Sequence, residues 1–259
     1  MKPLLRLHAL LISGLLICGV SLMSVIPLNA AEIRVLCTGA AQPAYEELKP
    51  QFERATGHTL ITEYDLPPAL IRKIDAGAPF DVLILSTDVA DLIGRGKLAA
   101  DSRTILGRYG IGIAIPVGST RPDFSTVDAF KRMLLEAKAI STSGEGSSGR
   151  YVLTLLDRLG IADQVKPKIR SGPGGAVTEL VVRREVDFAV VGRPPTIGAA
   201  GIEWAGLLPP ELQSWLLFTA GLSTSATQPA AGRALLSFLT TPAAAAVLKA
   251  RGLEPPGAP

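Results

Sequence analysis

A regular alternation between short apolar strands and amphipathic helices is the feature that most restricts the fold of this 259-residue chain. The pattern predicts strands at EIRVLCTG, HTLITEYD and FDVLILST, with helices at PAYEELKPQFERATG and PPALIRKIDAGAP between them. Strands that alternate with helices pair side by side in parallel, and the helices cover the faces of the sheet. The chain is therefore predicted to be an α/β protein.

A second unit of the same kind is predicted further along the chain. The extended stretch GRYGIGIAIPVGS leaves the first unit, and the alternation restarts with a helix at TVDAFKRMLLEA. Strands are predicted at KAISTS, KPKIRS and VDFAVVG, separated by helices over 148–159 and 176–185. SWLLFTAGLS is again extended, and a pair of helices ends the chain before a disordered tail over 255–259. Two α/β units leave a cleft between them, where small ligands commonly bind.

The N-terminus has the pattern of an export signal. Lys2 and Arg6 give a basic start, an apolar stretch covers 9–26, and the small residues of PLNAA follow. This order predicts a cleaved signal peptide over 1–31. A retained membrane anchor is the alternative, because an apolar run of about 18 residues is just long enough to cross a bilayer.

Charge and cysteine content argue against a nucleic-acid-binding protein and against a fold stabilised by disulfides. Removal of the signal lowers the formal net charge from +3 to about +1, and no stripe of Lys and Arg is left, so nucleic acid is not an expected partner. Cys37 is the one cysteine that remains, so no intrachain disulfide forms. Stability must come from burial, which the 47% hydrophobic content supports.

The residues needed for common enzyme chemistry are missing. GEGSSGR has the glycine spacing of a phosphate loop, but Arg150 and Tyr151 stand where that loop needs Lys and Ser or Thr. No G-x-S-x-G elbow surrounds Ser147 or Ser148, and His58 is the only histidine beyond the signal. Carboxylates do not cluster as metal ligands do. We therefore expect neither catalysis, nor a cofactor, nor a metal.

The stretch STSGEGSSGRYVLTLL predicts an anion site at the start of a helix. The first N–H groups of a helix have no partner inside it, and the helix dipole adds partial positive charge there. Ser147, Ser148 and Gly149 combine these N–H groups with hydroxyl donors and close backbone approach. The alternative is that Ser147 or Ser148 only caps the helix.

A second glycine-rich helix start follows at SGPGGAVTEL, where Gly175, Ala176 and Val177 take the same place. Each such loop alone is most simply an ordinary connection, but together they would aim N–H groups into the crevice outside the strand ends. Loops that follow the strands of the first unit form the facing wall. Their candidate ligand-binding residues are Gly39, Ala40, Pro67, Pro68 and Ser86.

Several segments together resemble a known family. The export signal, FERATGHTLITEY, LIRKIDAGAPFDVLILSTD, a chain crossing near 113–117 and the closing LLSFLTTPAAAAVLKARGL are similar to the periplasmic molybdate-type solute-binding proteins of ABC importers. The resemblance implies the two-lobed type II periplasmic binding protein fold. Each lobe would be a mixed, mostly parallel sheet flanked by helices. Lobe one would contain 32–113 and 218–254, lobe two 114–217, and two crossing strands would join them.

The resemblance also implies a function without catalysis. A monomer in the periplasm would capture a small anion, either a molybdate-like oxyanion or an organic carboxylate, by hinge closure. It would then deliver the anion to an ABC permease in the inner membrane. The alternative is a solute sensor or partner-docking protein that acts with a receptor instead of a permease.

Carried over residue by residue, the family's ligand positions lose most of their side-chain donors. Members place hydroxyl residues where this chain has Ala40 and the Pro67–Pro68 pair, and commonly a tyrosine where it has Gly192. The main-chain donors implied at Ser148 and at Ala176 or Val177 remain. Losing two or three donors weakens molybdate binding by several powers of ten. Arg193 would suit a carboxylate if it faces the cleft; otherwise it faces solvent or an interlobe salt bridge.

Overall fold

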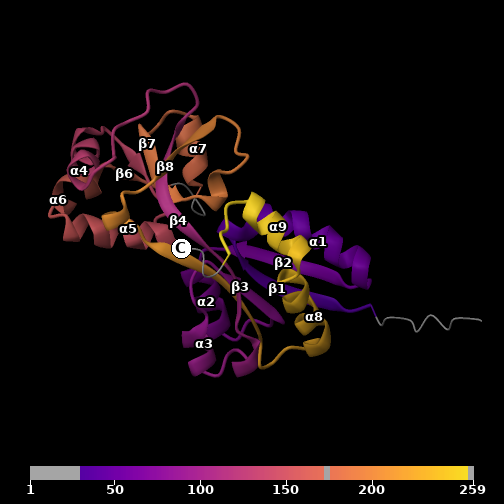
Figure 1. Ribbon diagram of the computed structural model, residues 1–259. Helices are drawn as coiled ribbons and strands as arrows, with labels where there is room; N and C mark the ends of the chain where they lie inside the picture. Colours follow the sequence, from indigo (N-terminus) through magenta and orange to yellow (C-terminus); the bar gives the residue numbers. More distant parts are fainter. Residues whose placement is uncertain (1–29, 172–175, 256–259) are drawn as a thin grey trace, which may run out of the picture.

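The computed structural model describes residues 30–171 and 176–255, which Figure 1 shows as a ribbon. The strands are β1 (Glu32–Thr38), β2 (Thr59–Asp65), β3 (Val82–Leu85), β4 (Thr104–Pro116), β5 (Ile140–Ser141), β6 (Ile169–Arg170), β7 (Phe188–Gly192), β8 (Ile202–Leu207) and β9 (Trp215–Leu222). The helices are α1 (Gln42–Thr56), α2 (Pro67–Asp75), α3 (Ala90–Gly94), α4 (Val127–Glu136), α5 (Ser147–Arg158), α6 (Ala162–Val165), α7 (Val177–Val182), α8 (Pro229–Leu239) and α9 (Pro242–Ala250). Nearly all of the predicted signal and tail lies outside these ranges.

The strands form two parallel groups joined by antiparallel neighbours, in the order β2-β1-β3-β9-β4-β7-β5-β6. β1 pairs in parallel with β2 and β3, and β5 pairs in parallel with β6 and β7. β9 and β4 run antiparallel to their neighbours between the two groups, and β8 adds to β4 outside this path. The predicted α/β architecture with mixed sheets is therefore correct, but among the described strands parallel and antiparallel pairs are equally common, so the sheets are not mostly parallel as expected.

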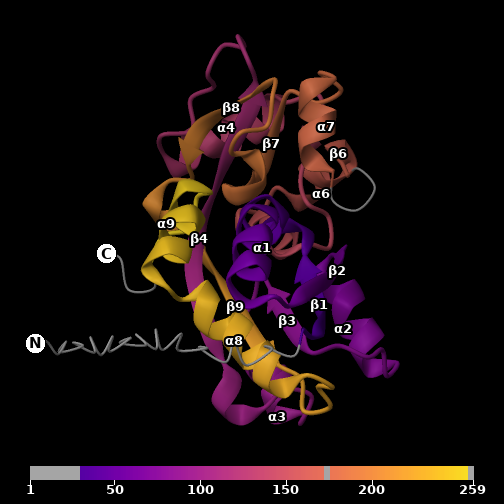
Figure 2. The ribbon, with the colours of Figure 1, turned by 90° about the vertical axis from the view of Figure 1, so that its right-hand side faces the viewer.

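Strand β4 connects the two groups because its partners change along its length. Thr104–Gly110 pair with β9, whereas Ile111–Pro116 pair with β7 and β8. In Figures 1 and 2, β4 accordingly runs from one body of the molecule into the other. The change of partner between Gly110 and Ile111 marks the crossing that the sequence placed near 113–117.

Each sheet is covered by helices on both faces, which explains the continuous apolar runs of its strands. In the first body, Val35 and Cys37 of β1 face α1 and α8, while Leu36 faces α2 and α3. In the second, Ile113 faces α4 and α5, while Ala114 faces α7. The result is two separately packed lobes, the architecture of type II periplasmic binding proteins.

The C-terminal helices return to the first lobe, where they pack beside α1 and β1 (Figure 2). The Thr241 hydroxyl accepts the Ala244 N–H at 3.3 Å, Pro242 begins α9, and Gly252 adopts a φ of 87° after the end of the helix. Across the described residues no single helix is long and apolar enough to span a membrane. α8 and α9 reach that apolarity only as a pair bent by 63°.

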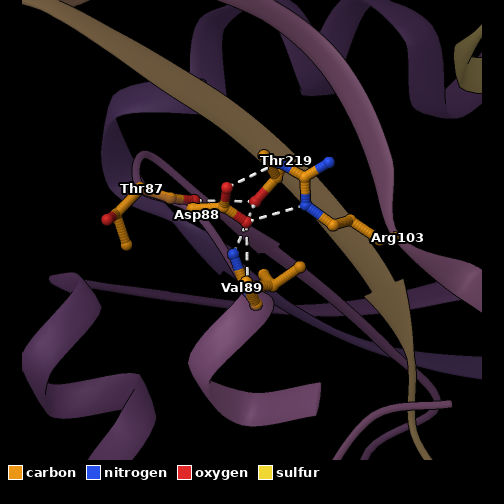
Figure 3. Close-up of polar contacts among 6 residues, drawn as sticks. Thr87, Asp88, Val89, Arg103 and Thr219 are labelled. Carbon is orange, nitrogen blue, oxygen red and sulfur yellow. Dashed lines mark hydrogen bonds and ion pairs between the residues drawn. The ribbon is translucent and has the colours of Figure 1, made fainter. Parts of the chain in front are cut away.

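A polar cluster fixes the loop that follows β3 (Figure 3). The Thr219 hydroxyl, fully buried on β9, donates to the Thr87 carbonyl at 2.7 Å and accepts the Val89 N–H at 3.1 Å. Beside it, the Arg103 guanidinium binds both carboxylate oxygens of Asp88 and holds the pKa of that carboxyl below its usual range. The start of this loop, at the carboxyl end of β3, is thereby held against β9.

Candidate functional site

A cavity of about 360 Å³ lies between the lobes, at the carboxyl ends of β1 and β3 and the N-terminus of α5. Crevices outside the carboxyl ends of strands are the usual binding places in open α/β sheets. Its walls come from both lobes and from β4. The lining residues are Thr38, Gly39, Ala40, Gln42, Pro43, Glu46, Leu66, Pro67, Ser86, Tyr109, Ser143, Gly146, Ser147, Ser148, Ala176, Val177, Thr178, Val191, Gly192 and Pro195.

The N-terminus of α5 supplies main-chain donors to this cavity. Gly146 precedes the helix in an extended conformation, with φ −62° and ψ 163°. Within the described residues no protein group accepts the N–H of Ser147 or Ser148. The next N–H, from Gly149, donates to the Ser143 hydroxyl at 2.8 Å. Ser143 therefore caps the helix, and the two preceding N–H groups remain available to an anion.

Hydroxyl groups from both lobes form a chain across the cavity. The Thr38 and Ser86 hydroxyls, both buried, lie 3.3 Å apart at the ends of β1 and β3. The Ser86 hydroxyl lies 3.1 Å from that of Ser147 on α5. In lobe two, the Ser143 and Ser148 hydroxyls are 2.9 Å apart. Neutral donors are thus concentrated around the start of α5.

Tyr109 of β4 adds a phenol to the same cluster. Its side chain is buried, and its ring packs against Phe218 of β9 with 5.0 Å between centroids. Burial raises the pKa of the phenol, an effect that the facing hydroxyls of Ser86 and Ser147 partly offset. The phenol therefore stays protonated and can donate a hydrogen bond throughout the physiological pH range.

Glu46 is the one charged side chain among the described residues that line the cavity. It lies one turn into α1, above Gln42, and accepts a hydrogen bond from the Tyr64 hydroxyl. Outside the cavity, Arg72 of α2 and Glu145 before α5 are 4.0 Å apart and well exposed, so their pair contributes little to stability. Apart from the Glu46 carboxylate, an anion in this cavity would meet neutral donors and a helix dipole, and no cationic side chain among the described lining residues.

Most residues proposed from the sequence line the cavity. The structure brings together Gly39, Ala40, Pro67, Ser86, Ser147, Ser148, Ala176, Val177 and Gly192. Pro68, Gly149 and Arg193 do not line it, and Gly175 lies outside the described residues. The Arg193 side chain is exposed and passes close to Gly252 instead.

Sequence reasoning missed several functional candidates, chiefly Thr38, Glu46, Tyr109 and Ser143. Ser143 was visible as a hydroxyl in the same glycine-rich loop. Thr38 is the last residue of the first strand, directly before the predicted binding residues Gly39 and Ala40. Nothing local marks Tyr109, because it reaches the cavity only through the path of β4.

Comparisons with known proteins show the family to which the chain belongs. Residues 33–254 match the family described as bacterial extracellular solute-binding protein. An aconitate isomerase from Pseudomonas sp. is 30% identical, with 96% of this chain and 97% of that protein covered. The molybdate-binding protein ModA of Azotobacter vinelandii is 26% identical, with 95% and 96% covered.

Solved structures show the same fold. The periplasmic molybdate-binding protein of Azotobacter vinelandii superposes with a TM-score of 0.73 at 19% identity, covering 86% of this chain and 99% of that one. The sulfate-binding protein SubI of Mycobacterium tuberculosis gives 0.70 at 18% identity, with 88% of each chain covered. The chain belongs to the bacterial extracellular solute-binding proteins, and it has the two-lobed type II periplasmic binding protein fold.

Proposed function

We propose that this protein binds a small organic carboxylate between its lobes and delivers it to an ABC importer. The observation that carries the proposal is the concentration of neutral donors around the start of α5, in a cavity whose described lining contains no cationic side chain. Helix N-termini and hydroxyls bind anions without a full positive charge. Such a site releases its ligand more readily than a buried ion pair, as handover to a permease requires.

The distribution of donors favours a carboxylate over a tetrahedral oxyanion. Thr38, Ser86 and Ser147 are linked to one another by hydrogen bonds, so their hydroxyls occupy one region of the cavity. Ala40 and Pro67, at the positions where molybdate binders place hydroxyls, offer no side-chain donor. A carboxylate needs donors at one end only, and its carbon skeleton can lie against apolar wall. A volume near 360 Å³ suits such an organic ligand.

Hinge closure and a periplasmic location complete the proposal. The bond between Ser86 and Ser147 joins residues of different lobes, and β4 and β9 connect those lobes, so ligand contacts from both sides would stabilise the closed form. The related proteins include periplasmic binding proteins. The signal expected over 1–31 would export this chain to the same compartment.

A ligand screen tests the proposal. We expect at least one of citrate, trans-aconitate, succinate and malonate to raise the melting temperature of the mature protein more than molybdate, sulfate or phosphate does. At a concentration a hundredfold above Kd, binding adds about 2.7 kcal/mol to the unfolding free energy. For a protein of this size that raises Tm by about 5–10 °C. Calorimetry would then give Kd. Stabilisation by the inorganic oxyanions alone would contradict the carboxylate assignment.

A second candidate function is isomerisation of an unsaturated tricarboxylate, favoured by the 30% identical aconitate isomerase and by Glu46. Such a reaction needs one base. The Glu46 carboxylate would take a proton from the CH₂ carbon next to the double bond. The electron pair would then shift the double bond, and the new carboxylic acid would return the proton to the far alkene carbon. Burial and its bond to Glu46 raise the pKa of Tyr64, whose protonated hydroxyl would orient this base.

Proton NMR of cis-aconitate in D₂O tests this second function. An active wild type would produce trans-aconitate, which carries deuterium only where the Glu46 carboxylic acid exchanges its proton with solvent before returning it. Glu46→Gln is expected to lower the rate at least a hundredfold because the amide cannot accept the proton. Glu47→Gln is the matched control. It changes the neighbouring residue of α1, which binds Arg251 outside the cavity, and should keep the wild-type rate. No interconversion by the wild type would eliminate the isomerase while leaving ligand binding open to the screen.

A further inference from the structure

The ring of Tyr109 lies against Gly192 in the cavity wall, at the place where a side chain at position 192 would be. A Cβ atom built on Gly192 would lie 2.4 Å from Cε2 and 2.8 Å from Cδ2 of the Tyr109 ring. Contacts this short do not occur between real atoms, so the ring sits where a side chain at position 192 would be. Gly192 ends β7 opposite Ile111 of β4, two residues after Tyr109.

We propose that Tyr109 is a ligand-binding residue of the cavity, and that position 192 is glycine because the Tyr109 ring fills the place of its side chain. This inference rests on the proposed function of the cavity. The resemblance to molybdate-type proteins implied a tyrosine at position 192, at the end of β7. Here the phenol reaches the cavity from the crossing strand instead.

The position of Tyr109 determines what it can recognise. Its hydroxyl end faces Ser86 of lobe one and Ser147 of lobe two, so donors from three separate elements converge on one point. A carboxylate oxygen has two lone-pair directions and can accept from more than one of them. The rigid ring, held by Phe218, also limits how deep a ligand can sit. Tyr109, with glycine at position 192, would therefore select a carboxylate group at the end of a slender molecule.

Calorimetry with trans-aconitate, citrate and molybdate tests the ligand contact. Tyr109→Phe removes only the hydroxyl and should raise Kd about ten- to a hundredfold for the tightest carboxylate. Tyr151→Phe is the matched control. Its hydroxyl donates to the Leu212 carbonyl at 2.8 Å, and Tyr151 does not line the cavity, so Kd should not change. An equal Kd for wild type and Tyr109→Phe overturns the assignment of Tyr109.

A double-mutant cycle tests the packing without any ligand. Gly192→Ala should lower Tm clearly in the wild-type background and only slightly in the Tyr109→Leu background, because the smaller side chain leaves room for the methyl group. Gly94→Ala is the control, since a Cβ there meets no atom within 4 Å. If the decreases in Tm caused by Gly192→Ala and Tyr109→Leu simply add in the double mutant, the proposed packing of the Tyr109 ring against position 192 is wrong. If the wild type binds none of the three probes, both the proposed function and the ligand contact of Tyr109 are wrong. The packing of Tyr109 against position 192 is tested separately, by the double-mutant cycle.

Discussion

Replacing Ser147 by proline is expected to abolish ligand binding while the protein keeps its fold. Ser147 is the first residue of α5, where proline is well accepted because its fixed φ suits the helix. Gly146 already has the extended conformation that a residue before proline adopts. The substitution removes an N–H that no described protein group accepts, together with the hydroxyl that bonds to Ser86. Two lost bonds to a charged ligand weaken binding by about two to four powers of ten.

Two further variants separate the possible causes of such a loss. Ser147→Ala removes the hydroxyl and keeps the N–H, so the difference in Kd between it and Ser147→Pro measures the main-chain donor. Val127→Pro places proline at the same position of α4, after the extended residue Thr126 and away from the cavity. It should bind like the wild type. Equal affinities for the alanine and proline variants at 147 would show that the helix N–H does not contact the ligand.

Much of the fold was predictable because its signals are local. The signals of α9 lie within a dozen positions of one another: Thr241 caps its start, and Gly252, with a positive φ, follows its end. β8 was missed for the opposite reason. IEWAGL is a short segment whose exposed and buried positions follow no clear period, and its strand conformation depends on pairing with the distant β4. Strand pairing of this kind is set by tertiary structure more than by propensity.

The candidate site likewise has parts that the sequence predicts and parts that depend on the tertiary structure. Loops after parallel strands and N-termini of helices could be placed from the sequence, since their direction follows from the α/β arrangement. Neighbouring residues at such a loop need not face the same way, so Gly192 lines the cavity while Arg193 turns to solvent near Gly252. Tyr109 shows the limit most clearly. It looks like an ordinary core residue of an apolar strand, and only the crossing of β4 brings its phenol to the cavity.

The largest loss of stability is expected from Asp81→Ala. Asp81 precedes β3, and its side chain is almost completely buried, with 1% exposure. One carboxylate oxygen accepts the Arg34 N–H at 2.8 Å, while the other accepts the N–H groups of Thr227 and Gln228 at 2.7 and 3.1 Å. It thus ties β1 to the segment that leads into α8. Alanine would leave three N–H groups without their acceptor, at about 1–3 kcal/mol each.

Urea unfolding at pH 7 would measure this loss, and we expect the unfolding free energy to fall by at least about 3 kcal/mol, with Tm lower by about 6–12 °C. Asp128→Ala removes an exposed aspartate from the first turn of α4 and should change stability by less than about 0.5 kcal/mol. Below its lower melting temperature, Asp81→Ala should still bind ligand with the Kd of the wild type, because Asp81 does not line the cavity. A changed Kd, or a loss of stability no larger than that of Asp128→Ala, would contradict this role.

Asp81 lies within IDAGAPFDV, one of the segments that carry the resemblance to solute-binding proteins. That segment would then mark the shared architecture of lobe one, so ligand identity has to be sought in the residues around the start of α5.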